Sequence, residues 1–142
     1  MAMESKIKTI GVLTSGGDAP GMNAAIRAAV RRGLSRGIKM KGILKGYDGL
    51  MNEEIIDMSA KDVSDTIERG GTILYTARCA EMRTEEGQRH AAETCRKHGI
   101  DGLVSSAATD PLQALRSWRI WESIPSACRA PLIWILPAQN IR

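Results

Sequence analysis

The chain has 142 residues and a formal net charge of +4, with 43% hydrophobic and 25% charged residues. This length suffices for one domain with a hydrophobic core. The sequence contains no apolar run of about 18 residues, which is the length that a membrane-spanning helix needs. Nucleic-acid binding is not expected either, because the lysines are dispersed and no cluster of aromatic side chains accompanies them as a stacking platform.

The first predicted elements are a strand, a glycine turn and a helix in direct succession. An apolar run over residues 7–13 predicts a buried strand, Gly16 and Gly17 follow it, and apolar residues at helical spacing predict a helix over residues 22–36. Glycine lets a ligand approach the backbone closely, and the N–H groups at the start of a helix attract anions. The succession therefore predicts a phosphate-binding turn. The alternative is an ordinary glycine-rich corner between a strand and a helix.

The predicted helix carries a group of arginines. Arg27 and Arg31 are four residues apart, with Arg32 beside them. Like charges at this spacing destabilise an isolated helix by about 0.2–0.5 kcal/mol, and an anion bound between them would relieve that cost. The pattern indicates either an anion site or a solvated basic face.

Strands and helices are expected to alternate as far as Val104, as in α/β proteins with a parallel sheet. The expected elements are a strand over 38–44, a short extended segment near 54–57, a helix over 60–69, an irregular glycine-rich stretch over 70–79, a helix over 84–98 and a strand that begins at Ile100. We therefore expect an α/β fold that is incomplete after its last strand.

The composition changes abruptly after Val104. All 14 glycines lie at or before Gly102, although average glycine usage is about 7%. All three tryptophans and four of the five prolines follow Val104. A proline-rich linker or tail is one explanation. We expect residues 1–104 to be part of one domain and residues 105–142 to form none.

Residues 1–104 resemble the amino-terminal part of the bacterial, ATP-dependent 6-phosphofructokinases. Six motifs in the family's order and spacing carry the resemblance: Thr14-Ser-Gly-Gly-Asp-Ala-Pro-Gly-Met-Asn23, Gly46-Tyr-Asp-Gly-Leu50, Val63-Ser-Asp65, Arg69-Gly-Gly-Thr72, Ala77-Arg78 and Gly99-Ile-Asp-Gly-Leu-Val104. The resemblance implies the first part of a Rossmann-like ATP-binding domain with a parallel sheet.

The resemblance also implies an activity and an active site. The family's enzymes are glycolytic homotetramers that transfer the γ-phosphoryl group of Mg-ATP to the 1-hydroxyl of fructose 6-phosphate. Gly17 would contact the ATP phosphates through its backbone, Arg78 would act on the phosphoryl group in transfer, and Cys79 would lie against the adenine. Arginine suits this role because its guanidinium stays charged and can contact two oxygens. A packed thiol is the alternative for Cys79.

An allosteric site is implied as well. Arg27 and Arg31 match the arginines that hold the phosphates of a regulatory nucleotide at a subunit interface of the family. The family often has a third arginine where this chain has Ala60, and Lys61 could replace it. The allosteric effectors therefore stay open.

Residues 105–142 read as an out-of-frame translation of the same gene. The family continues after Val104 with Val-Ile-Gly-Gly-Asp-Gly-Ser, which holds magnesium and the ATP phosphates, whereas this chain has Ser105-Ser-Ala-Ala-Thr-Asp-Pro111. Written as TCA TCG GCG GCG ACG GAT CCN and preceded by one G, these codons spell the family's motif. The same shift turns Ser126–Arg142 into a segment with Pro-Gly-Thr-Ile-Asp-Leu-Asp, which resembles the family's catalytic Pro-Gly-Thr-Ile-Asp-Asn-Asp.

The hidden frame also indicates the phosphoryl donor. ATP-dependent relatives have glycine after the aspartate of Gly-Gly-Asp, whereas pyrophosphate-dependent relatives have aspartate there. Asp110 is encoded by GAY, so the restored codon has G at its second position. Glycine is therefore allowed and aspartate is excluded, which predicts an ATP-dependent parent enzyme.

No metal site is expected in the chain as it is written. The magnesium-binding aspartate and the catalytic aspartate both belong to the unread frame, and Asp110 has no glycine loop around it. Cys79, Cys95 and Cys128 are widely separated and form no Cys-x-x-Cys pair. Thiols without a disulfide framework, and an amino terminus without a signal-peptide pattern, predict a cytoplasmic protein.

The chain as written is expected to have no kinase activity, and two other functions stay open. A small nucleotide-binding module would require residues 105–142 to complete the sheet. A protein-interaction role would use Trp118, Trp121 and Trp134 as apolar anchors.

Overall fold

A four-stranded sheet in the order β3-β2-β1-β4 forms the centre of the computed structural model, which describes residues 8–17 and 20–107. The strands are β1 (Thr9–Ser15), β2 (Lys39–Ile43), β3 (Ile55–Met58) and β4 (Gly102–Ala107). Most of the predicted tail, with Asp110, Cys128 and the three tryptophans, lies outside the described residues.

The expected parallel α/β sheet is confirmed for three of these strands. β1 pairs in parallel with β2 and with β4, whereas β3 pairs antiparallel with β2. Residues 44–54 connect β2 to β3, and a parallel crossover needs a dozen or more residues. The short connection therefore turns the chain back beside β2, which the sequence analysis did not anticipate.

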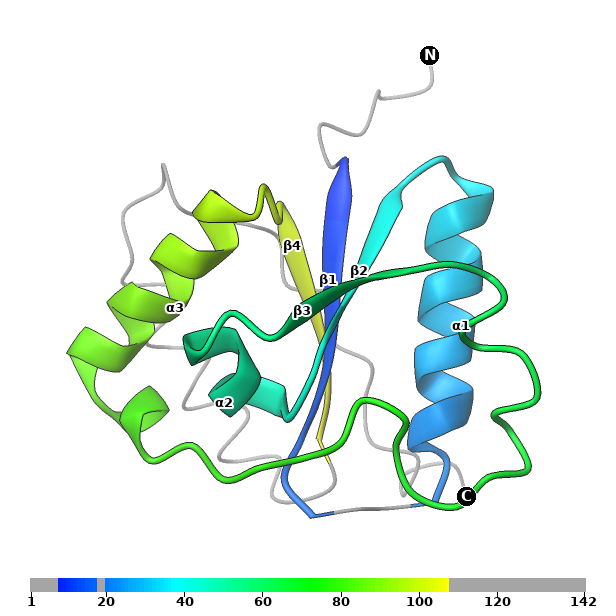
Figure 1. Ribbon diagram of the computed structural model, residues 1–142, viewed down its shortest axis with the longest axis horizontal. Coiled ribbons are helices and arrows are strands. Elements are labelled where there is room, and N and C mark those ends of the chain that lie inside the picture. Colours follow the sequence, from blue (N-terminus) through cyan, green and yellow to red (C-terminus); the bar gives the residue numbers. More distant parts are fainter. Residues whose placement is uncertain (1–7, 18–19, 108–142) are drawn as a thin grey trace, which may run out of the picture.

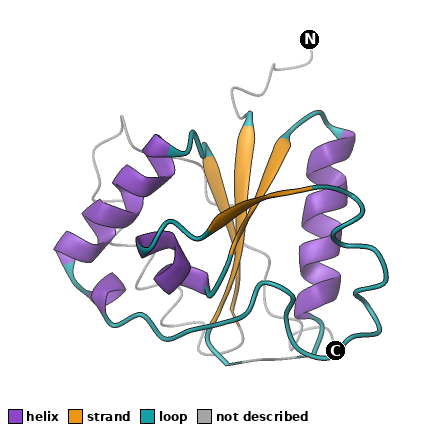
Figure 2. Ribbon diagram, in the orientation of Figure 1, coloured by secondary structure: helices purple, strands orange, loops and turns teal. Residues whose placement is uncertain are grey.

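Helices cover both faces of the sheet. Figure 1 shows α1 (Met22–Ser35) on one face, and α2 (Gly46–Met51) with α3 (Glu85–Lys97) on the other. A 3-10 turn, η1 (Glu81–Arg83), precedes α3, and Figure 2 shows the long loop segment that leads to it. Among the described helices, none has the length and apolar character needed to cross a membrane.

Alternating side chains of β1 supply the two cores, one on each face. Val12 packs on the side of α1 and Leu13 on the side of α3, and they are 1% and 0% exposed. Gly11 faces the same side as Leu13, and a Cβ there would lie 2.8 Å from Leu103 Cδ2. A larger residue at this position would therefore require the end of the Leu103 side chain to shift.

The predicted helices at 22–36 and 84–98 are confirmed to within one residue at each end. Gly37 follows α1 with φ 74°, and its amide donates to the carbonyl of Leu34. This left-handed glycine is a common way to end a helix. Thr84 caps α3 by accepting a hydrogen bond of 3.1 Å from the amide of Gly87.

The predicted helix over 60–69 is wrong. The amides of Asp62, Ser64 and Arg69 donate to carbonyls three residues back, as in successive turns. Asp65 has φ 54°, which a helix interior does not tolerate. The Asp62 carboxylate also accepts hydrogen bonds from the amide and hydroxyl of Ser59, which lowers the pKa of Asp62. Side-chain bonds of this kind compete with a helix.

β4 continues beyond Val104. Ser105 pairs with Leu13, Ser106 with Thr14, and Ala107 with Ser15. Pairing of parallel strands uses backbone groups, so serine and alanine can extend a strand that the preceding apolar residues begin. The change in composition after Val104 therefore does not coincide with the end of β4.

Candidate functional site

The candidate site lies at the end of the sheet where β1 stops and the glycine turn begins. α1 follows β1 on one face, while α3 precedes β4 on the other, so the helices change sides between β1 and β4. In open α/β sheets, ligands bind beyond the carboxyl ends of the strands at such a switch point. The predicted phosphate-binding turn therefore lies where this topology favours a ligand.

The backbone of the glycine turn is accessible at this point. Gly16 has φ 83° and Gly21 has φ 90°, both in the left-handed region that glycine adopts without strain. Gly17 is exposed, and a Cβ built on it would meet no described atom within 4 Å. Packing within the described residues thus does not account for glycine at position 17, which leaves its backbone open to a ligand.

The start of α1 complements an anion. Among the described residues, no side chain caps this helix, and no acidic residue lies in its first turn. The unpaired N–H groups of a first helical turn carry partial positive charge. The turn and the helix start together provide a polar, positively biased backbone.

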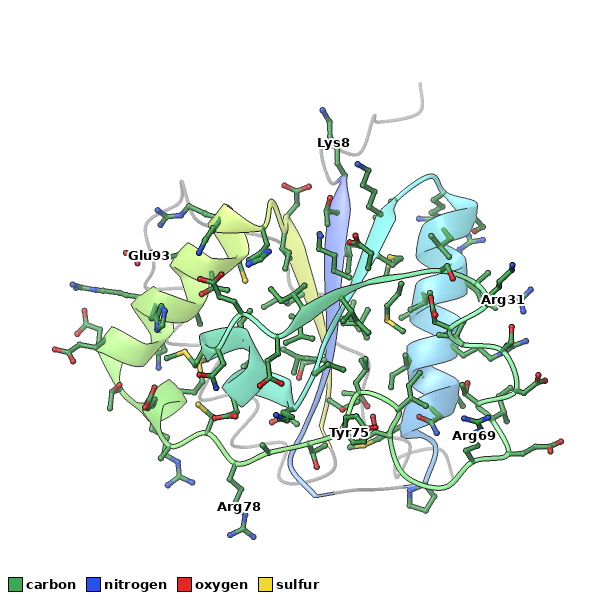
Figure 3. All side chains as sticks on the ribbon, viewed as in Figure 1. Lys8, Arg31, Arg69, Tyr75, Arg78 and Glu93 are labelled. Atoms are coloured by element: carbon green, nitrogen blue, oxygen red, sulfur yellow. The ribbon has the colours of Figure 1, made fainter. Side chains whose placement is uncertain are left out.

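Arg78 lies at the same end of the sheet as the glycine turn. The segment from Arg69 to Arg78, which we call the strap, runs from α1 along this end toward η1 (Figure 1). Thr14, near the end of β1, donates a hydrogen bond of 2.9 Å to the carbonyl of Tyr75 in the strap. Figure 3 shows the exposed side chain of Arg78 directed away from the ribbon. The guanidinium is thus free to reach a bound anion.

Cys79 follows Arg78 and is partly buried. Its side chain packs against the core on the α3 face. This position fits the packed-thiol interpretation of Cys79, and its predicted contact with adenine stays a prediction.

Arg27 and Arg31 lie on α1, away from Arg78. Arg27 Nη1 donates a hydrogen bond of 2.7 Å to the carbonyl of Val63, so part of its guanidinium is committed to the turns after β3. Arg31 is exposed on the outer side of the helix (Figure 3). The two predicted sites are therefore separate, and their arginines do not share one pocket with Arg78.

Two buried polar groups, Asn23 and Thr14, were missed by the sequence analysis as part of this site. Asn23 and Thr14 contact the strap through their side chains and are 2% and 0% exposed. Burial raises the pKa of Tyr47, while a hydrogen bond with Ser105 opposes that rise. Asn23 could have been noticed because it shares the buried stripe of Ile26, where an apolar residue is expected.

A magnesium ion is not supported by the residues that the structure describes. None of them form a group of three or more His, Cys, Asp or Glu side chains that could hold a metal ion. Magnesium prefers carboxylate and phosphate oxygens. The described part of the site therefore offers backbone amides and Arg78 to an anion, but no group of three or more metal-binding side chains.

The two described cysteines are expected to differ in reactivity. Burial raises the pKa of Cys95 to about 11, and its side chain is 6% exposed. At pH 8 its thiolate fraction is on the order of one in a thousand. In a Cys128→Ser variant, iodoacetamide should modify Cys79 first, as measured by peptide mass spectrometry. Equal rates in the folded chain would contradict this burial, and equal rates after denaturation serve as the control.

Comparison with known proteins gives a consistent result. A family model described as Phosphofructokinase matches residues 9–127. The chain is 63% identical over 98 residues to an ATP-dependent 6-phosphofructokinase of Clostridium botulinum, covering 69% of this chain and 31% of the relative. The chain thus spans about a third of the length of that curated relative.

Solved structures show the same likeness. A phosphofructokinase of Pichia pastoris in the T-state aligns with a TM-score of 0.77 at 38% identity, covering 89% of this chain and 14% of that one. A phosphofructokinase of Saccharomyces cerevisiae aligns with a TM-score of 0.66 at 45% identity, covering 69% of this chain and 13% of that one. The described α/β arrangement therefore recurs in much larger proteins.

Proposed function

The chain belongs to the phosphofructokinase family, and on this premise we propose that it is the amino-terminal part of an ATP-dependent 6-phosphofructokinase. The complete enzyme would transfer the γ-phosphoryl group of ATP to the 1-hydroxyl of fructose 6-phosphate. The observation that carries the proposal is the open backbone at Gly17 at the switch point of the sheet. A backbone that no Cβ covers suits close contact with phosphate oxygens.

Two features of this chain would act on the phosphates. The amides of the glycine turn and of the start of α1 would bind the phosphate chain of ATP and orient it. The guanidinium of Arg78 would contact the γ-phosphoryl group and stabilise charge as the group moves to the sugar hydroxyl. Cys79 would lie beside the adenine, where its partial burial offers an apolar contact.

Arg27 and Arg31 would hold the phosphates of a regulatory nucleotide. Both lie on one helix, and Arg31 is exposed. Arg27 would have to give up or share its hydrogen bond to the carbonyl of Val63. The family resemblance further supports a cytoplasmic homotetramer for the complete enzyme.

We also propose that residues 105–142 are the translation of a shifted reading frame. With the appropriate synonymous codons, one inserted base would yield both the magnesium-binding loop and the catalytic segment of the family at their expected positions. Restoring the frame after Val104 and assaying the product for ATP-dependent phosphorylation of fructose 6-phosphate tests the proposed function.

The 142-residue chain itself is expected to show no phosphorylation of fructose 6-phosphate above background. Both aspartates that the reaction needs are missing from its sequence, and general-base help typically contributes about 10²–10⁴-fold in rate. A coupled assay for ADP and fructose 1,6-bisphosphate measures this. Turnover of about 1–100 s⁻¹, which is ordinary for kinases, would show that other residues do the chemistry.

A nucleotide-binding module without kinase activity is the second candidate. The continuation of β4 to Ala107 favours it, because the sheet extends beyond Val104 in the chain as it is written. ATP should then slow the alkylation of Cys79 in the 142-residue chain, whereas inosine, which lacks phosphates, should not.

A further inference from the structure

The side chain of Asn23 forms hydrogen bonds with the backbone of the first half of the strap. Asn23 Nδ2 donates a hydrogen bond of 3.1 Å to the carbonyl of Arg69, and Asn23 Oδ1 accepts one of 2.8 Å from the amide of Ile73. Both ends of this buried amide group are therefore used on strap backbone. The start of α1 and residues 69–73 are joined as one unit.

Thr14 holds the second half of the strap. Its hydroxyl donates a hydrogen bond of 2.9 Å to the carbonyl of Tyr75. The hydroxyl of Thr72 lies 3.0 Å from that of Thr14. Because a hydroxyl has one proton to donate, Thr72 is the donor in this second bond. Thr72 Oγ1 also accepts from the amide of Leu74 at 3.2 Å, and the carbonyl of Leu74 accepts from the amide of Lys45 at 2.7 Å. The strap thus depends on β1 and on the end of β2 for its hydrogen bonds.

The conformation at Tyr75 needs this support. Tyr75 is 62% exposed, so packing does not fix it, and its φ of 59° lies in the left-handed region that a tyrosine rarely adopts. The bond from Thr14 fixes the carbonyl of this residue, three positions before Arg78. A change at Thr14 would therefore be transmitted to the path of the backbone that leads to Arg78.

We propose that Thr14 is a positioning residue for Arg78. The glycine turn begins at Gly16, two residues after Thr14. Thr14 therefore fixes the strap relative to the backbone that is proposed to bind phosphate. The inference rests on the proposed function of Gly17 and Arg78. It adds that the hydroxyl of Thr14, rather than its bulk, sets the geometry between them.

The test uses the frame-restored enzyme and a matched pair of substitutions. Thr14→Val keeps the shape and removes the hydroxyl, whereas Thr14→Ser keeps the hydroxyl and removes a methyl group. We expect Thr14→Val to lower kcat about 10- to 100-fold, in keeping with the cost of a small misplacement, with a smaller change in KM for fructose 6-phosphate. Thr14→Ser should stay within about threefold of the parent enzyme.

A double substitution separates positioning from packing. If Thr14 acts through Arg78, Thr14→Val should lower kcat less than about twofold further in an Arg78→Ala background. Full additivity of the two losses, or an equal loss in Thr14→Ser, would overturn the proposal. If Thr14→Val does not fold, the partly buried Thr72→Val takes its place, with Thr72→Ser as its partner.

Hydrogen exchange in the 142-residue chain distinguishes this proposal from the proposed function. Thr14→Val should speed exchange of the Leu74 amide at least about fivefold, while amides in the middle of α3 stay unchanged. If the exchange rate of the Leu74 amide did not change in Thr14→Val, the positioning role of Thr14 would be overturned, while the proposed function would not be affected. The other outcome is faster exchange at Leu74 in Thr14→Val, combined with a frame-restored wild-type protein that lacks kinase activity. It would overturn the proposed function, and with it the effect of Thr14 on catalysis.

Discussion

The frame-restored protein is expected to phosphorylate fructose 6-phosphate with ATP at about 1–100 s⁻¹, the ordinary range for kinases. Under the proposed frameshift, inserting one base after the codon for Val104 would restore Val-Ile-Gly-Gly-Asp-Gly-Ser and, further on, the segment with Pro-Gly-Thr-Ile-Asp. These segments supply the acidic residues that the described part of the chain does not gather into a cluster. The assay follows ADP and fructose 1,6-bisphosphate with the purified product.

The matched control inserts three bases at the same place, which lengthens the protein but leaves the frame unchanged. This control should stay at background. A stop codon soon after the position of Arg142 in the restored frame would contradict the view of a single lesion. A folded, restored protein that uses pyrophosphate instead of ATP would contradict the substrate assignment and leave the family membership intact.

Arg78→Ala in the restored protein should lower kcat about 10²- to 10³-fold, as the loss of one group that stabilises transition-state charge typically does. The side chain is exposed, so we expect little change in the free energy of unfolding. Arg78→Lys should recover only part of the rate, because an ammonium group lacks the planar fork of guanidinium. Rates are measured at saturating ATP and fructose 6-phosphate.

Arg89→Ala is the matched control for this experiment. Arg89 is also an exposed arginine, and it contacts Glu85 on its own helix at 2.7 Å. Exposed ion pairs of this kind contribute about 0.3–0.5 kcal/mol, so kcat should not change. A similar loss in both variants, or a lowered Tm in Arg78→Ala alone, would indicate that Arg78 acts through folding.

The sequence sufficed to predict elements whose residues carry strong local signals. The apolar run of β1 and the helical stripe of α1 each mark an element by short-range chemistry. The glycine turn was recognisable for the same reason, since Gly16 and Gly17 stand in direct succession between a strand pattern and a helix pattern. The family resemblance then assigned Gly17 and Arg78.

Local sequence patterns failed to predict the structure where the conformation of the backbone depends on its surroundings in the fold. Residues 60–69 have an adequate helical pattern, but they form turns: the distant Arg27 binds the carbonyl of Val63, and a local bond between Ser59 and Asp62 adds to this effect. β3 reverses its direction because the preceding connection is short. Its pairing with β2 is invisible in its own four residues.

By itself, the sequence determined the α/β class, the position of the glycine turn and the family, because these depend on residue types at short spacing. Only the tertiary structure decided which buried polar groups serve the site. Asn23 and Thr14 each reach partners 46 to 61 residues further along the chain, and a side-chain hydrogen bond across such a distance leaves no periodic trace. Its energy depends on geometry that exists only after β1, α1 and the strap have packed together.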